Sequence, residues 1–225
     1  VASMPPVPFI YLEEGRFTVN EEVAELFDSV PPPIAIVSVV GLYRTGKSFL
    51  LNKLIGVDSG FEVGPTVKAC TKGIWLWSEP VRLEGVTVLF MDTEGTGSTN
   101  KDSTYDSRVF SLAVLLSSQL IYNSVGSIDE NSINQLSLVT SLTKHIHVKA
   151  AMEGEEDDGS AFAQYFPSFL WVLRDFSLQL QSDGHSITPK QYLEESLQMQ
   201  AGFSEAVMSK NRIRQMISHF FQDRH

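Results

Sequence analysis

The chain has 225 residues, of which 43% are hydrophobic and 20% are charged, a balance typical of a globular protein and not of a disordered one. Its formal net charge of −10 argues against binding to nucleic acid, which needs a basic face, and against membrane contact through this segment. The single cysteine, Cys70, excludes an internal disulfide and forms no zinc pattern. We therefore expect one domain in a reducing, cytoplasmic compartment.

The N-terminal part of the chain predicts a strand, a helix and a second strand. Residues 5–12 are proline-rich and then apolar, which indicates a short edge strand. Asn20 is a good helix N-cap, and the acids after it suit the first turn of a helix that ends before the prolines at 31–33. The β-branched run from Ile34 to Val40 then predicts a buried strand.

Residues 41–48, Gly-Leu-Tyr-Arg-Thr-Gly-Lys-Ser, have the Walker A spacing. In a loop of this kind successive backbone N–H groups surround phosphate, Lys47 bridges the β- and γ-phosphates, and the Ser48 hydroxyl ligates Mg²⁺. An ordinary glycine turn is the alternative interpretation. The position of the motif between the buried strand and a helix that starts near Phe49 favours phosphate binding.

A second part of the nucleotide site is predicted further along the chain. Residues 74–78 and 86–91 are apolar and predict two strands, and the second of these ends on Asp92-Thr93-Glu94-Gly95. An acid at this position holds the magnesium shell, and the amide of the glycine meets the γ-phosphate. The motif is weak by itself, but it becomes informative downstream of a Walker A loop.

The remaining segments continue the alternation of helices and strands. They are a helix over 107–118, a strand over 120–123, a helix over 129–147, a strand over 169–173, a helix start with a capping box at 188–191, and a helix over about 204–221. This order predicts an α/β fold, a P-loop NTPase three-layer sandwich with a mainly parallel central sheet and helices on both faces. Ligands bind such sheets at the carboxyl ends of the strands.

The choice of base depends on the residues that follow the late strand. The usual guanine motif, Asn/Thr-Lys-x-Asp, is absent there, and Leu173-Arg174-Asp175-Phe176 stands in its place. The Asp175 carboxylate can accept two hydrogen bonds from guanine N1 and N2, a donor pair that adenine lacks. An ordinary surface Arg-Asp pair is an equally good interpretation of the residues alone. These residues therefore do not exclude that the chain is an ATPase.

Five segments together resemble the large GTPase domain of guanylate-binding proteins, members of the dynamin superfamily that are related to atlastins. The segments are 41–48, 70–75, 92–95, 121–124 and 173–176, and the similarity runs from about Pro8 to the C-terminus. The resemblance implies that residues 1–225 are the GTPase domain without its final strand, its guanine-covering region and the helical stalk.

The resemblance also implies a role for each matching residue. Arg44 would be an arginine finger supplied in cis, and Lys47 and Glu94 would complete the catalytic group. Mg²⁺ would be held by Ser48, Thr71 and Asp92. The residues implied to hold the nucleotide are Tyr43, Arg44, Thr45, Gly46, Lys47, Ser48, Phe49, Thr71, Gly95, Arg174 and Asp175.

The implied function is hydrolysis of GTP to GDP, or onward to GMP, with nucleotide-dependent homodimerisation through this domain. One departure bears on the rate. The family has a water-orienting serine two residues before the threonine that corresponds to Thr71, and this chain has Ala69 there. The alternative function is therefore a GTP-regulated interaction module with weak or no hydrolysis.

Overall fold

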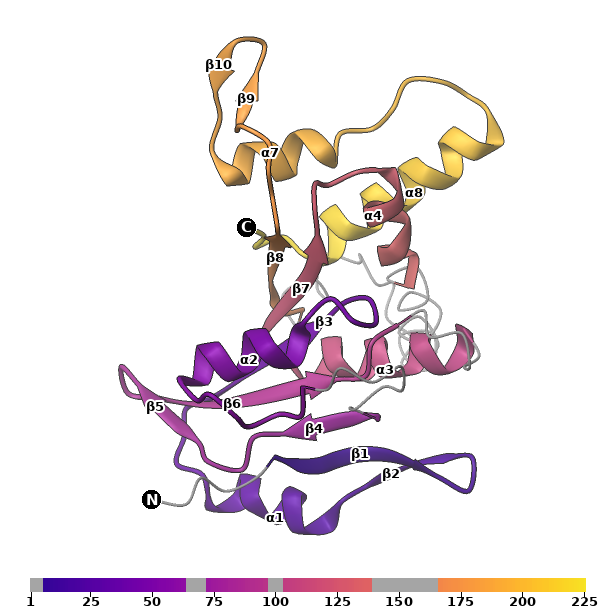
Figure 1. The fold of residues 1–225 in the computed structure, drawn as a ribbon. Coiled ribbons are helices and arrows are strands. Elements are labelled where there is room, and N and C mark those ends of the chain that lie inside the picture. The colour runs from indigo at the N-terminus through magenta and orange to yellow at the C-terminus, as the bar shows by residue number, and fades with distance from the viewer. Residues whose placement is uncertain (1–5, 64–71, 97–102, 139–165) are drawn as a thin grey trace. The chain divides into compact units, whose positions relative to one another are not determined.

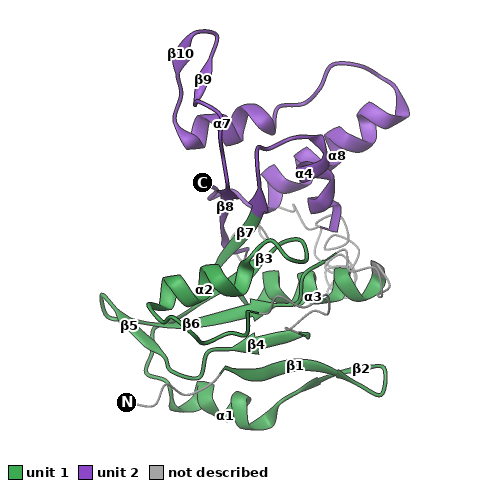
Figure 2. Cartoon of the chain, viewed as in Figure 1, with its two compact units in different colours: residues 1–123 green, residues 124–225 purple. Residues whose placement is uncertain are grey.

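The computed structural model describes residues 6–63, 72–96, 103–138 and 166–225 (Figure 1). The chain divides into two compact units, unit 1 from Val1 to Asn123 and unit 2 from Ser124 to His225 (Figure 2). Among the described helices, none combines the length and the apolar character that a membrane crossing requires.

Unit 1 is built on a sheet whose strands lie in the order β2-β1-β4-β6-β3-β7, with β5 paired to β6. β3 pairs in parallel with both β6 and β7, so the centre of the sheet is parallel as predicted, whereas β1, β2, β4 and β5 add antiparallel pairs. The strands are β1 (Val7–Glu13), β2 (Arg16–Val19), β3 (Ile34–Val40), β4 (Ile74–Leu76), β5 (Val81–Leu83), β6 (Val86–Thr93) and β7 (Gln119–Val125), whose last two residues belong to unit 2.

Three helices cover this sheet. α1 (Glu21–Ser29) and α3 (Ser103–Leu116) contribute to an apolar core with β1, β3, β4 and β6, while α2 (Lys47–Ile55) packs on β3 and β6. The predicted cap of α1 is confirmed, because the Asn20 side chain accepts a hydrogen bond from the Glu22 amide at 3.1 Å.

The predicted edge strand at the N-terminus has a different place in the sheet. β1 lies between β2 and β4, and β2 is the outer strand. β2 was not predicted because it has only four residues, and the turn before it places Glu14 at φ 48°, a backbone angle that its residue type does not favour.

Unit 2 contains the end of β7 and the elements that follow it. These are α4 (Glu130–Gln135), the 3₁₀ helix η1 (Leu136–Leu138), β8 (Ser168–Arg174), the hairpin strands β9 (Gln181–Ser182) and β10 (His185–Ser186), α7 (Pro189–Ser196) and α8 (Glu205–Phe220). The helix predicted to start at residue 129 begins there but leaves α-geometry after Gln135, and residues 139–147 of that prediction lie outside the described residues. The predicted capping box of α7 is confirmed.

The core of unit 2 is aromatic. Phe169 of β8 stacks on Phe221 with ring centroids 4.7 Å apart, and both side chains are fully buried. The chain beyond α8 runs beside β8, where the Phe169 amide donates to the Asp223 carbonyl at 2.8 Å and the His225 amide donates to the Phe169 carbonyl at 2.9 Å. β8 and the residues that follow α8 are therefore held to each other within this unit.

Candidate nucleotide site

The Walker A segment forms a tight loop between β3 and α2 in unit 1. β3 ends at the buried Val40, and α2 begins at Lys47. Gly46, the N-cap of α2, has left-handed backbone angles (φ 82°) and makes no side-chain capping bond. Because the N-cap provides no side chain to bond the first amides of α2, these amides can bind an anion. The positive end of the helix dipole favours an anion at the same position.

The loop is held against the end of β7 by Asn123. Its Nδ2 atom donates to the Thr45 carbonyl at 2.8 Å, and a Cβ atom on Gly41 would lie 2.2 Å from the Asn123 carbonyl oxygen. Only glycine fits at position 41 in this arrangement. Asn123 was not among the residues expected in the site, although it belongs to segment 121–124 of the family resemblance and brings an amide to the carboxyl end of a neighbouring strand.

Lys47 lies inside the site and is 6% exposed. Its Nζ atom donates to the Leu42 carbonyl at 3.0 Å. Burial lowers the pKa of the Lys47 ammonium, and the nearby carboxylates of Asp92 and Glu94 act in the opposite direction. The loop therefore holds a cation with few solvent contacts, which strengthens its attraction for an anionic ligand.

Ser48 and Asp92 meet as the spacing of the two motifs predicts. The Ser48 hydroxyl donates to Asp92 Oδ2 at 2.6 Å, and Asp92 is fully buried. Because the hydroxyl proton is directed to the carboxylate, the serine lone pairs remain available, and both side chains offer the hard oxygen donors that Mg²⁺ prefers. No cluster of three or more acidic, histidine or cysteine side chains within the described residues could hold a metal by itself. The arrangement suits Mg²⁺ that is also ligated by phosphate and water.

The segment after β6 is fastened to the Walker A loop. The Tyr43 amide donates to the Thr96 carbonyl at 3.0 Å, and the Thr96 amide donates to the Gly41 carbonyl at 3.2 Å. A Cβ on Gly95 would lie 2.4 Å from Tyr43 Cα and 2.7 Å from Lys47 Nζ. Gly95 therefore lies beside the loop, where its absence of a side chain permits close approach.

Glu94 turns inward and is 4% exposed. Its Oε2 atom accepts hydrogen bonds from the Gly73 amide at 2.9 Å and from the Tyr105 hydroxyl at 2.7 Å. Tyr105 was not among the residues expected in the site. No short sequence motif connects it with Glu94, because the contact depends on how α3 packs against β6.

Arg44 of the loop and Phe49 of α2 are both exposed, unlike Lys47. Arg44 has left-handed backbone angles (φ 64°), is exposed, and lies over the Tyr43 ring at 5.4 Å from its centroid. Phe49, in the first turn of α2, is 44% exposed. Ala69, Cys70 and Thr71 lie outside the described residues. The half-buried Trp75 contacts the residue that follows this segment, because its Nε1 atom donates to the Lys72 carbonyl at 2.8 Å.

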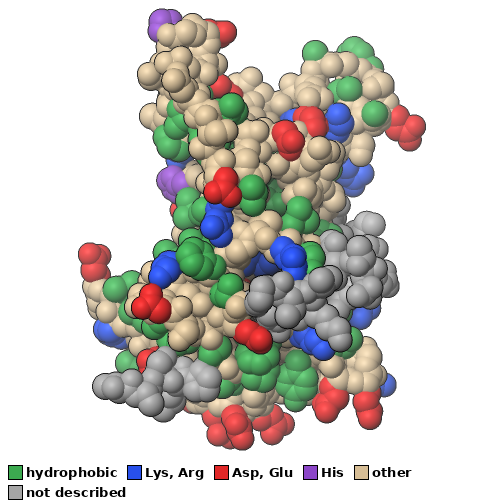
Figure 3. All heavy atoms as spheres, viewed as in Figure 1, with side chains coloured by type: hydrophobic (Ala, Val, Ile, Leu, Met, Phe, Trp, Pro, Cys, Tyr) green, Lys and Arg blue, Asp and Glu red, His purple; other side chains and the backbone are tan. Residues whose placement is uncertain are grey.

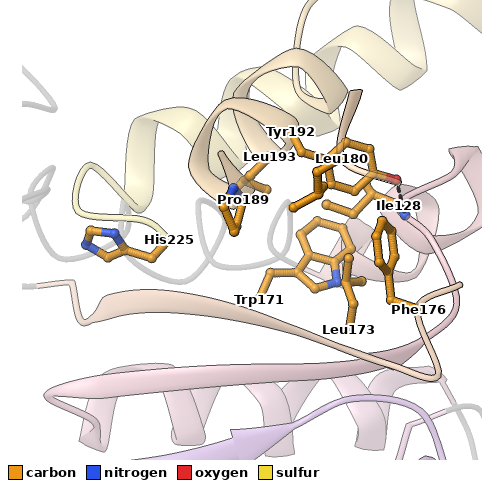
Figure 4. A pocket seen from close by; sticks show the side chains of 9 residues that line it. All are labelled: Ile128, Trp171, Leu173, Phe176, Leu180, Pro189, Tyr192, Leu193 and His225. Atoms are coloured by element: carbon orange, nitrogen blue, oxygen red, sulfur yellow. Dashed lines mark hydrogen bonds between the residues drawn. The ribbon is translucent and has the colours of Figure 1, made fainter. Parts of the chain in front are cut away.

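Arg174 and Asp175 belong to unit 2, at the end of β8. The Arg174 carbonyl accepts a hydrogen bond from the Gly126 amide at 2.8 Å, and the exposed Asp175 has left-handed backbone angles (φ 55°). Unit 2 also has an apolar pocket of ≈ 220 Å³ beside this turn (Figure 4). The pocket is lined by Ile128, Trp171, Leu173, Phe176, Leu180, Pro189, Tyr192, Leu193 and His225.

Comparison with known proteins places these features in one family. The profile described as "Guanylate-binding protein, N-terminal domain" matches residues 14–225, which include parts of both units. The chain is 44% identical to Guanylate-binding protein 7 of Homo sapiens over 96% of this chain and 34% of that protein. It is also 44% identical to Guanylate-binding protein 1 of Mus musculus over 97% of this chain and 38% of that protein.

The chain spans about a third of the length of these curated relatives. Among solved structures, it is similar to Toc33 from Arabidopsis thaliana in complex with GDP and Mg²⁺, with a TM-score of 0.46 and 17% identity over 90% of this chain and 73% of that chain. That likeness is too distant to bear on function. The profile match over residues 14–225 shows that the chain belongs to the guanylate-binding protein family.

Proposed function

We propose that this chain binds GTP with Mg²⁺ and hydrolyses it to GDP. The observation that carries the proposal is the arrangement around α2, where buried Lys47 and the Ser48–Asp92 pair lie directly behind a glycine-capped helix start. This is the donor set that a triphosphate and its metal ion need. Membership of the guanylate-binding protein family supports guanine as the base.

The phosphates would bind at the loop and at the start of α2. Backbone amides from Gly46 onward and the Lys47 ammonium would surround the β- and γ-phosphate oxygens. Mg²⁺, when bound, would neutralise developing charge on these oxygens, with Ser48 as a direct ligand, Asp92 acting through water, and Thr71 completing the shell in the triphosphate state. Gly95 would present its amide to the γ-phosphate.

In the chemical step a water molecule attacks the γ-phosphorus. The bond between the γ-phosphorus and the β–γ bridging oxygen breaks, and the products are GDP and inorganic phosphate. Arg44, exposed on the loop, would swing over the phosphates and stabilise the charge on the transition state. Glu94 would help to position the water through hydrogen bonds.

Asp175 would select guanine. Its carboxylate is exposed at the end of β8, where it can accept hydrogen bonds from N1 and N2 of the base, and Arg174 would support the turn or cover the base plane. The remaining loop residues of the predicted set, Tyr43, Thr45 and Phe49, would line the nucleotide. The same site would also give GMP, by hydrolysis of GDP.

We also propose that the GTP-bound form associates as a homodimer through this domain. The competing function is a GTP-regulated interaction module with little turnover. This alternative is favoured by Ala69, the residue two positions before Thr71, because alanine has no hydroxyl with which to orient the attacking water.

The decisive experiment measures turnover of GTP and ATP together with the size of the protein in its apo, GDP-bound and GDP–aluminium fluoride-bound forms. We expect GTP turnover and a dimer with the fluoride complex. Dimerisation without hydrolysis would establish the interaction module instead. Equal competition by ATP would show that the role assigned to Asp175 is wrong.

A further inference from the structure

Three segments of unit 1 meet at one oxygen atom, Oε2 of Glu94. Glu94 follows β6 directly, Gly73 precedes β4, and Tyr105 lies in the first turn of α3. The Gly73 amide and the Tyr105 hydroxyl both donate to this oxygen, at 2.9 Å and 2.7 Å. The ends of β4, β6 and α3 are therefore joined through a carboxylate that is only 4% exposed.

The Gly73 amide is fixed by contacts of its own. The Glu94 amide donates to the Gly73 carbonyl at 2.8 Å, so the two residues are joined in both directions. Gly73 has φ +72°, and a Cβ at this position would lie 2.2 Å from the Ile10 carbonyl oxygen. Because Gly73 is two residues beyond Thr71, the Glu94 carboxylate holds the point at which the Thr71 segment enters the sheet.

The Tyr105 hydroxyl is also held in a donating position. The ring stacks on Phe17 with centroids 5.5 Å apart and planes 20° apart. Burial raises the pKa of the Tyr105 hydroxyl, and the hydrogen bond to Glu94 raises it further. The hydroxyl therefore stays protonated at neutral pH and donates its proton to the carboxylate.

We propose that Tyr105 is a positioning residue for the hydrolysis proposed above, on which this inference rests. Its hydroxyl and the Gly73 amide fix the orientation of the Glu94 carboxylate and join it to the segment that contains Thr71. A carboxylate that loses one of its donors is held less firmly, and its distance from the water beside the γ-phosphate then varies more. Ala69 supplies no hydroxyl in this chain, whereas Tyr105 brings one to Glu94 from α3.

Tyr105→Phe tests the proposal, because it removes one hydroxyl and keeps the ring that stacks on Phe17. We expect kcat for GTP to fall about 10- to 100-fold, while the Kd for a fluorescent GTP analogue changes less than about twofold. Tyr192→Phe is the matched control. The Tyr192 hydroxyl accepts a hydrogen bond from the Ile128 amide at 3.0 Å, so the control also loses one tyrosine hydroxyl and one hydrogen bond, but away from Glu94, and it should keep its kcat.

A double-mutant cycle separates positioning from simple stabilisation. In a Glu94→Ala background, Tyr105→Phe should have no further effect on kcat, because Tyr105 acts through Glu94. Independent, multiplicative losses would show that Tyr105 has a merely structural role and would overturn the proposal.

Amide hydrogen exchange at Gly73 gives a readout that does not need turnover. We expect faster exchange of this amide in both Tyr105→Phe and Glu94→Ala than in the wild type. If the wild type hydrolyses no GTP, the proposed function fails, and Gly73 exchange still decides whether Tyr105 holds Glu94. Unchanged exchange in Tyr105→Phe would overturn the present inference.

Discussion

At the scale of single residues, the site depends on how closely backbone segments approach one another. Gly95 is one such case, because a Cβ there would lie 2.4 Å from Tyr43 Cα, a backbone atom that cannot move aside by changing a rotamer. The Walker A loop and the segment after β6, which we propose to contact the phosphates, must therefore shift together if either of them shifts.

We predict that Gly95→Ala weakens nucleotide binding at least about tenfold and destabilises the protein by about 1–3 kcal/mol, because the added atom displaces the loop. Titration with a fluorescent GDP analogue and thermal unfolding would measure the two effects. Gly85→Ala is the control for the steric effect, because a Cβ there meets nothing within 4 Å; its positive φ (+87°), which Gly95 does not have, means that any loss of stability in this variant comes from the backbone conformation and not from a clash. If both variants bind GDP equally well, the close approach is not important for binding.

Arg44 is exposed on the loop, so its charge can be removed without opening the core. We predict that Arg44→Ala lowers kcat by about 10³-fold, since an arginine finger contributes on this scale, and leaves the Kd for GTP nearly unchanged. Single-turnover hydrolysis and equilibrium binding measure the two quantities. Lys53→Ala removes another exposed cation and should change neither. Equal losses of binding and turnover in Arg44→Ala would contradict the finger role.

At the scale of secondary-structure elements, helix caps decide where several helices begin. Asp129 caps α4: its Oδ1 atom accepts from the Ser132 amide and from the Ser132 hydroxyl, both at 2.8 Å. The bond from the Ser132 amide is the main cause that holds the pKa of Asp129 below its ordinary value. Thr188 caps α7 with a neutral hydroxyl that accepts from the Gln191 amide at 3.1 Å.

These two caps should differ in their response to pH. We predict that Asp129→Ala lowers the free energy of unfolding by about 1 kcal/mol at pH 7. Because the folded pKa is depressed, this contribution is complete above the unfolded pKa of about 3.9 and is lost as the pH falls through the folded pKa. Thr188→Ala should cost a similar amount at every pH. Denaturant unfolding between pH 3 and 7 checks this; a constant gap for Asp129→Ala would contradict it.

The elements that the sequence predicts well are those with a long local pattern. The apolar runs of β3 and β6, the Asn20 cap and the capping box of α7 each contain enough adjacent signal to fix type and place. β2 and β5 were missed because strands of four and three residues contain too few alternating positions to distinguish them from loop.

In the candidate site, too, some contacts could be predicted from the sequence and others could not. The Ser48–Asp92 contact was predictable, since Asp92 lies near the carboxyl end of β6 and Ser48 lies in the helix that follows β3, and these two parallel strands are neighbours. The contacts of Tyr105 with Glu94 and of Asn123 with Thr45 were not. They depend on the packing of whole elements, which no short motif specifies.

At the scale of the whole molecule, negative charge dominates. The formal net charge is −10, and part of it gathers at the bottom of the face in Figure 3, over α1 and the β1–β2 hairpin. The exposed acids of that region are Glu13, Glu14, Glu21, Glu22, Glu25 and Asp28. Two copies of the chain therefore repel each other at long range.

We predict that the proposed dimer with GDP and aluminium fluoride forms more readily as the ionic strength rises from about 0.02 M to about 0.15 M, where the Debye length shortens to about 8 Å. Sedimentation velocity at several salt concentrations measures the association constant. A dimer that dissociates over this range would indicate an interface held by ion pairs, and the repulsion would then be unimportant.

The indole of Trp75 has a consequence for spectroscopy. The chain has three tryptophans, and two of them, Trp77 and Trp171, are 1% and 7% exposed, so solvent reaches their rings less than it reaches that of Trp75. Trp75 is half-buried and bonded to the Lys72 carbonyl, next to the segment that contains Thr71. Nucleotide binding that rearranges this segment should shift the fluorescence of the unlabelled protein, and Trp75→Phe should abolish the shift. The chain thus contains its own optical probe of the proposed nucleotide binding.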